Sequence, residues 1–416
     1  MIRYIKTLVK KAKNNSYLIT QVNSQMKDKA LLSMACALLD NKDFILKENK
    51  KDLDNAKSKG LESSFIDRLS LNEERINQMS ISLKDIAALP DVTGKVISGW
   101  RRPNGLFINK IRVPLGVILI IYEARPNVTS DCIGLCFKSS NISILRGASS
   151  SINSNRAIVK ILRNAAKSVG IDFDPFFFID KTDHKVVDLL LKEKDYIDLV
   201  IPRGGESLIK KVSDASLIPI IKHYKGVCHI FVDEFADFEK ALKICINAKV
   251  QRPHVCNAVE TILVHKAIAP RFLIRLKKEF DKFKVKIKGD KKTVNILKDI
   301  TIAREKDWYI EYLDLIVSIK VVKSVKEAID HINFYGSHHT DSIITESISN
   351  ATKFVNEIDS ACCFVNISTR FSDGYQFGLG AEIGISTDKL HARGPMGLED
   401  LTTYKYVVYG NGQIRT

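Results

Sequence analysis

The chain has 416 residues, 45% of them hydrophobic and 27% charged, which indicates two or three globular domains. Because no apolar run approaches the ~20 residues of a membrane helix, we expect no membrane contact. The formal net charge is +16, but the lysines are scattered among acidic residues and no nucleic-acid motif is present. We therefore expect a solvated basic surface that attracts anionic substrates, and no nucleic-acid partner.

The first 90 residues predict helices. The segment MIRYIKTLVKKAKNNS is basic and amphipathic, which indicates a first surface helix, with a transit peptide as the alternative. Apolar residues at helical spacing then continue to a stop at Gly60.

After this helical part the pattern becomes extended. Two runs flank the turn signal RPNG near residues 98–113, and the apolar run GVILIIY that follows is typical of a parallel strand covered on both faces. Strands and helices then alternate in two successive sets, which predicts two doubly wound α/β domains. We place the first domain at residues 1–228, the second at 229–390 and a C-terminal return at 391–416. The extended segments near 98–113 and 403–409 are left outside both sheets.

The eight cysteines are irregularly spaced and match neither a disulfide scaffold nor a zinc site. We therefore expect reduced thiols, a cytosolic protein and no metal. One of them, Cys256, precedes an alternating run in QRPHVCNAVETILVH, residues 251–265. The residues alone leave two alternatives for Cys256, a small packing residue at the start of a strand or a nucleophile.

Three loops in the first domain follow predicted strands, at the ends where open α/β sheets bind ligands. They are ILRGASSS with Arg146, VIPRGGES with Arg203, Gly204 and Gly205, and YEARPNVTSD with Glu123, Arg125 and Asn127. Backbone N–H groups at a helix N-terminus favour anions, and arginine occurs in each loop, so an anionic cofactor or substrate is indicated. A plain strand–helix turn is the alternative for each loop.

Several long blocks resemble the gamma-glutamyl phosphate reductases, or glutamate-5-semialdehyde dehydrogenases, a family within the aldehyde dehydrogenase superfamily. The blocks are VPLGVILIIYEARPNVTSD, ILRGASS, VIPRGGESLI, RPHVCNAVETILVH, YGSHHTDSIIT and FSDGYQFGLGAEIGISTDKLHARGPMGLEDLTTYKYVV. They keep the family's order from about residue 5 to the C-terminus. No kinase domain precedes them, so the resemblance is to the free-standing enzyme.

The resemblance implies an NADPH-dependent reduction of L-glutamyl 5-phosphate to L-glutamate 5-semialdehyde and phosphate, the second step of proline biosynthesis from glutamate. Cys256 is the implied nucleophile, which would form a thioacyl enzyme. Asn127 is the candidate oxyanion donor beside the Cys256 backbone N–H. Hydrolytic relatives carry a glutamate upstream of the cysteine, whereas His223 lies near that place here, as a candidate for proton transfer. The alternative is another acylating or hydrolytic aldehyde dehydrogenase of the same superfamily.

The resemblance also implies binding residues. For NADP these are Arg146, which suits a 2′-phosphate, Arg203, Gly204 and Gly205 near the pyrophosphate, and Glu311 at the nicotinamide ribose. For the substrate they are Arg125, Ser337, His338, Arg370 and Phe377. The segments near 98–113 and 403–409 correspond to an oligomerisation arm, which implies a homodimer or tetramer. A transient contact with the glutamate 5-kinase that supplies the substrate is a further expectation.

Overall fold

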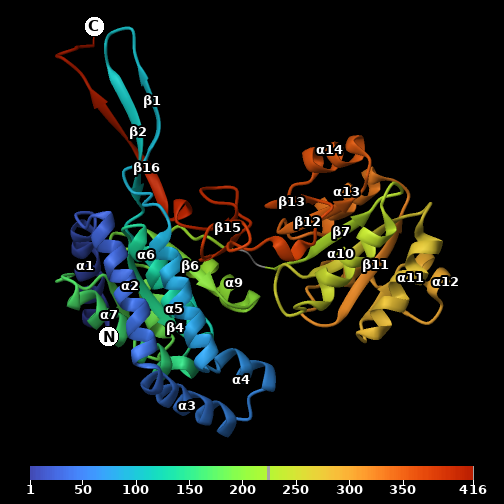
Figure 1. Ribbon diagram of the computed structural model, residues 1–416, viewed down its shortest axis with the longest axis horizontal. Coiled ribbons are helices and arrows are strands. Elements are labelled where there is room, and N and C mark those ends of the chain that lie inside the picture. The colour runs from blue at the N-terminus through green and yellow to red at the C-terminus, as the bar shows by residue number, and fades with distance from the viewer. Residues whose placement is uncertain (223–224, 416) are drawn as a thin grey trace. The chain divides into compact units, whose positions relative to one another are not determined.

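The computed structural model describes residues 1–222 and 225–415, apart from the side chain of Ser64 (Figure 1). The chain forms two compact units. Unit 1 comprises Met1–Lys222, Gly378–Gly384 and Met396–Thr416, and unit 2 comprises His223–Phe377 and Ile385–Pro395. In the part that the structure describes, no helix is both long and apolar enough to cross a membrane.

Unit 1 is built on a parallel four-stranded sheet with the order β5-β4-β3-β6. Its strands are β3 (Val117–Tyr122), β4 (Ile142–Gly147), β5 (Phe176–Phe178) and β6 (Leu199–Arg203). Every residue of β3 and β4 is buried. The continuous apolar run in β3 therefore has the structure that the sequence predicts, a central strand covered on both faces.

Helices cover both faces of this sheet. From β3 the chain passes through α6 (Asn127–Lys138) to the neighbouring strand β4, and then through α7 (Ile152–Ser168) to the next strand, β5. Both crossovers step across the sheet in the same direction. Because such crossovers are right-handed, α6 and α7 lie on the same face of the sheet. The return through α8 (Lys185–Leu190) to β6 lies on the other face, where α1 (Ile2–Ile19) contacts α8, β3 and β4. Helix α9 (Glu206–Ala215) follows β6.

The remaining N-terminal helices pack outside α6 and α7. They are α2 (Ser24–Asp40), α3 (Lys42–Ser58), α4 (Ser63–Leu69) and α5 (Glu73–Ala88). The prediction of helices over the first 90 residues is confirmed, and α1 buries one face that includes Ile5, Val9 and Ile19.

A separate antiparallel sheet of unit 1 forms an arm with the order β1-β2-β16. Its strands are β1 (Val96–Arg101), β2 (Phe107–Pro114) and β16 (Thr402–Tyr409). Strand β2 pairs with β1 on one side and with β16 on the other, from Thr402 opposite Pro114 to Tyr409 opposite Phe107. In Figure 1 the arm extends away from the helices of unit 1. The extended segments that the sequence left outside both sheets thus pair with each other.

Unit 2 contains a parallel seven-stranded sheet with the order β10-β9-β11-β8-β7-β12-β13. Its strands are β7 (Cys228–Val232), β8 (Val259–His265), β9 (Lys286–Gly289), β10 (Thr301–Ile302), β11 (Ile316–Val322), β12 (Thr340–Ile344) and β13 (Cys362–Val365). The two parallel sheets with helices on both faces confirm the prediction of two doubly wound α/β domains.

Two apolar cores lie on opposite faces of the sheet in unit 2. One core joins the strands to α10 (Phe238–Val250), α11 (Ala269–Lys282) and α12 (Lys291–Leu297). The other joins them to α13 (Val325–Tyr335) and α14 (Ile348–Glu357). All seven residues of β8 are buried, although their alternation is typical of a strand with one exposed face. This difference follows from the central place of β8 in the sheet, with helices on both sides.

The compact units divide the chain differently from the three expected segments. The first segment of unit 1 ends at Lys222, and after Phe377 the chain contributes residues to unit 1, then to unit 2 and then to unit 1 again. Short strands β14 (Gly384–Ser386) and β15 (Gly394–Met396) pair with each other in this segment. Each unit is therefore completed by residues from late in the chain.

Candidate active site

Cys256 lies in a turn between α10 and β8 in unit 2. The turn is closed by a hydrogen bond from the Ala258 N–H to the Val255 carbonyl oxygen, 3.0 Å apart. Because the turn precedes β8, it lies at the amino end of the parallel strands, next to the start of β7. The side chain of Cys256 is partly exposed, whereas Asn257 and Ala258 after it are buried. An accessible thiol on a firmly packed turn suits a nucleophile.

The start of β7 supports the carbonyl group of Cys256. The Cys228 thiol donates a hydrogen bond to the Cys256 carbonyl oxygen over 3.2 Å. A Cβ atom on Gly226 would lie 1.8 Å from the same oxygen, so only glycine allows this approach. Burial raises the pKa of the Cys228 thiol well above its usual value, and the nearby carboxylate of Asp341 adds to the effect. Cys228 is therefore a neutral hydrogen-bond donor.

Arg370 holds the turn from both sides of the cysteine. Its Nε donates to Gln251 Oε1 over 2.8 Å, and its guanidinium also donates to Asn257 Oδ1. The Asn257 amide in turn donates to the Ser372 carbonyl oxygen over 2.8 Å. Burial lowers the pKa of Arg370, and Arg252 lowers it further. Arg370, expected as a substrate contact, thus lies at the Cys256 turn and is bonded to the turn itself.

The segment before β12 also reaches this region. Ser337 Oγ accepts a hydrogen bond from the Val227 N–H over 2.9 Å, next to Cys228. His338 adopts a left-handed conformation with φ of 59°, and its Nδ1 lies 3.8 Å from a carboxylate oxygen of Asp359. Ser337 is therefore close to the nucleophile turn, while His338 turns toward Asp359.

Two further expected residues come from other segments of unit 2. Phe377 is 45% exposed, and its ring centroid is 6.2 Å from that of Phe364. Glu311 is partly buried in the loop between the 3-10 helix Glu305–Tyr309 and β11. Its charge acts on both Cys228 and Glu260, raising the pKa of each. Glu311 is thus near the nucleophile turn in space, although 55 positions separate it from Cys256 in the sequence. The expected proton-transfer residue His223 lies outside the described residues.

The expected cofactor loops meet at the carboxyl ends of the strands in the sheet of unit 1. Tyr122 at the end of β3 pairs with Gly147 at the end of β4 and with Arg203 at the end of β6. The three loops that leave these strands therefore begin side by side. This is the arrangement that the sequence predicts for an anion-binding edge, and it brings Arg146, Arg203 and the Glu123–Asn127 loop together.

The glycines after β6 pack against Glu123. A Cβ atom on Gly204 would lie 2.6 Å from the Glu123 carboxyl carbon, so any larger residue here requires the Glu123 side chain to move. The Gly205 N–H, which caps the N-terminus of α9, donates to Glu123 Oε2 over 3.1 Å. Arg203 is partly buried, and its guanidinium lies 3.9 Å from Glu382. A carboxylate at the first turn of α9 indicates that this helix end accepts negative charge.

Arg146 is buried, with 6% of its surface exposed. Its guanidinium donates to the backbone carbonyl oxygens of Gly147 and Thr182, and burial lowers its pKa. Its Nε has no hydrogen-bond partner among the described residues. A buried donor without a partner is costly, so this Nε is an unsatisfied donor at the carboxyl end of the sheet.

The loop after β3 carries the remaining two expected residues. Asn127 begins α6, is exposed, and its amide nitrogen lies 3.4 Å from Asp131 Oδ2. Arg125 is also exposed, and its backbone N–H donates to the Glu123 carbonyl oxygen over 2.7 Å. Both side chains belong to unit 1, whereas Cys256 belongs to unit 2.

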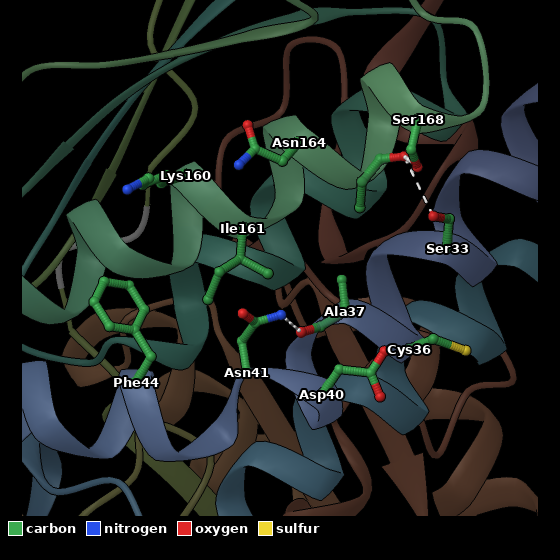
Figure 2. A pocket seen from close by; sticks show the side chains of 11 residues that line it. Ser33, Cys36, Ala37, Asp40, Asn41, Phe44, Lys160, Ile161, Asn164 and Ser168 are labelled. Atoms are coloured by element: carbon green, nitrogen blue, oxygen red, sulfur yellow. Dashed lines mark hydrogen bonds between the residues drawn. The ribbon is translucent and has the colours of Figure 1, made fainter.

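A pocket of 560 Å³ lies elsewhere, among the helices of unit 1. Figure 2 shows its lining side chains, which come from α2, the start of α3 and α7. Ser33 Oγ donates to the Ala165 carbonyl oxygen over 3.2 Å at one end, and Lys160 and Phe44 lie at the other. None of the expected site residues lines this pocket, so it is separate from the candidate active site.

Comparisons with known proteins agree with this geometry. The aldehyde dehydrogenase family matches residues 6–296. A gamma-glutamyl phosphate reductase from Sulfurihydrogenibium sp. (strain YO3AOP1) is 52% identical over 421 residues, covering 99% of this chain and 94% of that protein. A gamma-glutamyl phosphate reductase from Thermodesulfovibrio yellowstonii is 52% identical over 406 residues, covering 98% of this chain and 97% of that protein. The crystal structure of gamma-glutamyl phosphate reductase from Thermotoga maritima superposes with a TM-score of 0.97 at 47% identity, covering 99% of this chain and 100% of that one.

The two parallel sheets and the cysteine turn before β8 thus define an oxidoreductase of the aldehyde dehydrogenase family. Within it, the chain belongs to the gamma-glutamyl phosphate reductases. A more distant structure, an acetylating aldehyde dehydrogenase from Geobacillus thermoglucosidasius, shares the fold with a TM-score of 0.70 at 17% identity. The family resemblance drawn from the sequence is confirmed.

Reasoning from the sequence missed the residues that hold the nucleophile turn in place. Gly226, Cys228 and the buried pair Lys249 and Glu260 were not expected at the site. One signal was available, because an acidic residue inside the strand VETILVH is unusual and must find a partner once it is buried. No local pattern marks Gly226 or Cys228, since their role depends on the pairing of β7 with β8.

Proposed function

We propose that this protein reduces L-glutamyl 5-phosphate with NADPH, giving L-glutamate 5-semialdehyde and phosphate for proline biosynthesis. The observation that carries the proposal is the partly exposed thiol of Cys256 on a turn held by Arg370, Cys228 and Gly226. It is supported by relatives that bear the name of this activity at 52% identity over nearly the whole chain.

In the proposed reaction the Cys256 thiolate attacks the acyl carbon of the substrate. A sulfur–carbon bond forms, the carbon–oxygen bond to phosphate breaks, and phosphate leaves with the bonding electrons. The backbone N–H of Cys256, with the Asn127 amide as the second candidate donor, would stabilise the developing oxyanion. Addition of a hydride and a proton to the thioester then gives a thiohemiacetal, which releases the aldehyde and regenerates the thiol.

The carboxyl edge of the sheet in unit 1 suits the cofactor, which supplies the hydride when bound. Arg146 is buried there with an Nε that lacks a partner among the described residues, so it could bind a 2′-phosphate. The backbone at Gly204 and Gly205 would approach the pyrophosphate at the start of α9, after Glu123 moves away from the Gly205 N–H. Glu311 would hold the nicotinamide ribose.

The acyl group on Cys256 is proposed to leave by hydride transfer and not by hydrolysis. The upstream stretch IIKHYKGVCHIFVD contains no glutamate that could activate water. This favours a phosphate-dependent enzyme over the hydrolytic alternative, and it would protect the thioacyl enzyme from water.

The test uses the reverse reaction, in which glutamate 5-semialdehyde is oxidised with NADP in the presence and absence of inorganic phosphate. We expect a rate that requires phosphate, and we expect NADP to be preferred over NAD. A rate that is independent of phosphate would favour a hydrolytic aldehyde dehydrogenase, and a rate that requires coenzyme A would favour a CoA-acylating one.

The nucleophile is tested with Cys256→Ala. We expect this variant to lose activity entirely and to retain the circular dichroism spectrum and melting temperature of the wild type. Cys36→Ala, which removes an exposed thiol on α2, is the matched control and should remain fully active. Activity of Cys256→Ala near that of the wild type would remove Cys256 from the mechanism.

A further inference from the structure

A buried ion pair joins the two ends of the nucleophile turn. Lys249 is in the last turn of α10 and Glu260 is the second residue of β8, so the residues between them include Cys256. Lys249 Nζ lies 2.7 Å from Glu260 Oε2, and neither side chain is exposed to solvent. Burying two charges is costly, so such a pair contributes little net stability compared with apolar residues of the same volume. Its presence therefore needs another explanation.

Each member of the pair also bonds to the backbone of the loop that carries Glu311. Lys249 Nζ donates to the Asp314 carbonyl oxygen over 3.2 Å. Glu260 Oε1 accepts from the Leu313 N–H over 3.4 Å. The loop is thus bonded at two successive residues, only a few positions after Glu311.

A third bond connects the turn and the loop directly. Nδ1 of His254, two residues before Cys256, lies 2.5 Å from the Leu313 carbonyl oxygen. Leu313 itself adopts a left-handed conformation with φ of 52°, which a leucine rarely adopts without external support. The bonds from Glu260 and His254 to its N–H and carbonyl groups provide that support.

We infer that Lys249 and Glu260 are positioning residues that fix the Glu311 loop relative to the Cys256 turn. The inference rests on the proposed function, in which Cys256 carries the acyl group and Glu311 holds the nicotinamide ribose. Hydride transfer requires the acyl carbon and the nicotinamide to be aligned. Cys256 would hold the acyl carbon and Glu311 the nicotinamide ribose, so the alignment would depend on the Lys249–Glu260 pair that connects their two segments. Neither residue of the pair needs to touch substrate or cofactor for this role.

The first test measures amide hydrogen exchange in the protein without substrate. In Glu260→Gln and Lys249→Met, we expect amides within residues 254–257 and 312–315 to exchange together, roughly tenfold faster than in the wild type, because each variant weakens the bonding of the pair to the backbone of Leu313 and Asp314. Lys138→Met is the matched control, since Lys138 is an equally buried lysine, paired with Asp28 in unit 1. It should leave exchange in both segments unchanged.

The second test separates positioning from stability. The double variant Lys249→Met/Glu260→Met removes both charges, and it should restore the melting temperature because an apolar pair avoids the desolvation cost. We expect it still to show fast exchange in both segments, a kcat reduced at least about tenfold and a raised KM for NADPH. The inference would be overturned if the double variant recovered wild-type exchange protection, kcat and KM along with its melting temperature. It would also be overturned if the single variants showed the same exchange rates as the wild type.

These outcomes are independent of the outcome for the proposed function. The exchange experiment needs no substrate, so it reports on the coupling of the two segments whatever reaction the enzyme catalyses. If the wild-type protein fails to reduce the acyl phosphate while its two segments still exchange together, the proposed function fails and the coupling stands. If the wild type is active and the segments exchange independently, only the coupling fails.

Discussion

Arg370 shows how one residue can be expected at a site for one reason and be present for another. The resemblance implies that it contacts the anionic substrate, whereas the structure bonds it to Gln251 and Asn257 on both sides of Cys256. A guanidinium can bond in two directions within one plane, and an ammonium group cannot reproduce this geometry. Arginine and lysine at this position should therefore differ in activity even though they carry the same charge.

We predict that Arg370→Lys lowers kcat about 100-fold, almost as much as Arg370→Ala, because a displaced nucleophile slows the chemical step. The KM for the acyl phosphate should change less than kcat. Steady-state kinetics of both variants test this. Arg275→Ala, which removes a surface arginine paired with Glu239 in unit 2, should behave as wild type. If Arg370→Lys keeps its kcat and changes only KM, the charge of Arg370 acts on the substrate instead.

Glu260 predicts a pH dependence of stability. Burial raises the pKa of Glu260 to about 7, from a usual value of 4.5, although the attraction of Lys249 lowers it. Between these two values the folded protein keeps a proton that the unfolded chain releases, so the free energy of unfolding falls as pH rises through this range. Glu260 therefore destabilises the folded protein progressively as the pH rises towards its folded-state pKa.

Glu260→Gln should remove this dependence. We expect the melting temperature of the variant, relative to that of the wild type, to increase steadily from pH 5 to pH 8. Calorimetry across this range provides the measurement, and Glu234→Gln, a carboxyl at the surface of the same unit, is the control. If the difference in melting temperature between variant and wild type is the same at every pH from 5 to 8, the Glu260 carboxyl is ionised throughout this range and the prediction is wrong.

At the scale of elements, the pairing of β7 with β8 creates the support for the turn that contains Cys256, the proposed nucleophile. Cys228 begins β7 and lies opposite Val259 at the start of β8, so the chain before β7 runs alongside the turn that contains Cys256. Gly226 makes the closest approach, with no room for a side chain against the Cys256 carbonyl group. The two strands therefore position the turn as well as forming the sheet.

We predict that Gly226→Ala displaces the turn and lowers kcat/KM by about 100-fold or more, because the carbonyl group of Cys256 must move. Gly99→Ala, in β1 of the arm, is a suitable control, since its added Cβ would meet the end of the flexible Asn109 side chain. Activity assays should be combined with alkylation of Cys256 by iodoacetamide, followed by mass spectrometry. Wild-type kinetics and alkylation in Gly226→Ala would show that the turn tolerates the methyl group.

The parts of this site that the sequence predicted are those with local signals. The apolar run of β3, the glycines after β6 and the extended strands of the arm all appear where they were expected, because propensity and periodicity are properties of short segments. The role of Cys256 came from family resemblance and not from its surroundings. Other supports of its turn were missed because Gly226, Cys228 and Glu260 reach it through strand pairing and loop packing, which no short pattern encodes.

At the scale of the molecule, the arm of unit 1 has the composition of a surface that contacts another chain. Its outer strands β1 and β16 leave backbone edges without strand partners in the part of the chain that the structure describes. Exposed apolar and aromatic side chains lie along it, including Trp100, Tyr404, Tyr406, Val408 and Tyr409. Both observations favour the homodimer, or tetramer of dimers, that the resemblance implies.

We predict that the wild type is an oligomer and that Tyr406→Lys combined with Val408→Lys makes it monomeric, because each adds a charge to this exposed strand without changing its pairing with β2. Light scattering coupled to size-exclusion chromatography provides the mass. Ile274→Lys combined with Phe283→Lys, at exposed positions in and just after α11, is the control and should keep the oligomer. A wild-type protein that is already monomeric at micromolar concentration would contradict the prediction.

The pairing of β2 with β16 also has a consequence for biosynthesis. The whole of unit 2 separates these two strands along the chain, so a ribosome makes β2 long before it makes its partner. During that interval one edge of β2 remains open, and an open edge in a nascent chain is a site for mispairing. The arm can be completed only when β16 emerges, which delays any assembly through it until after unit 2 has been synthesised. Subunits that associate by this arm should therefore meet as nearly finished chains and not as partners on neighbouring ribosomes.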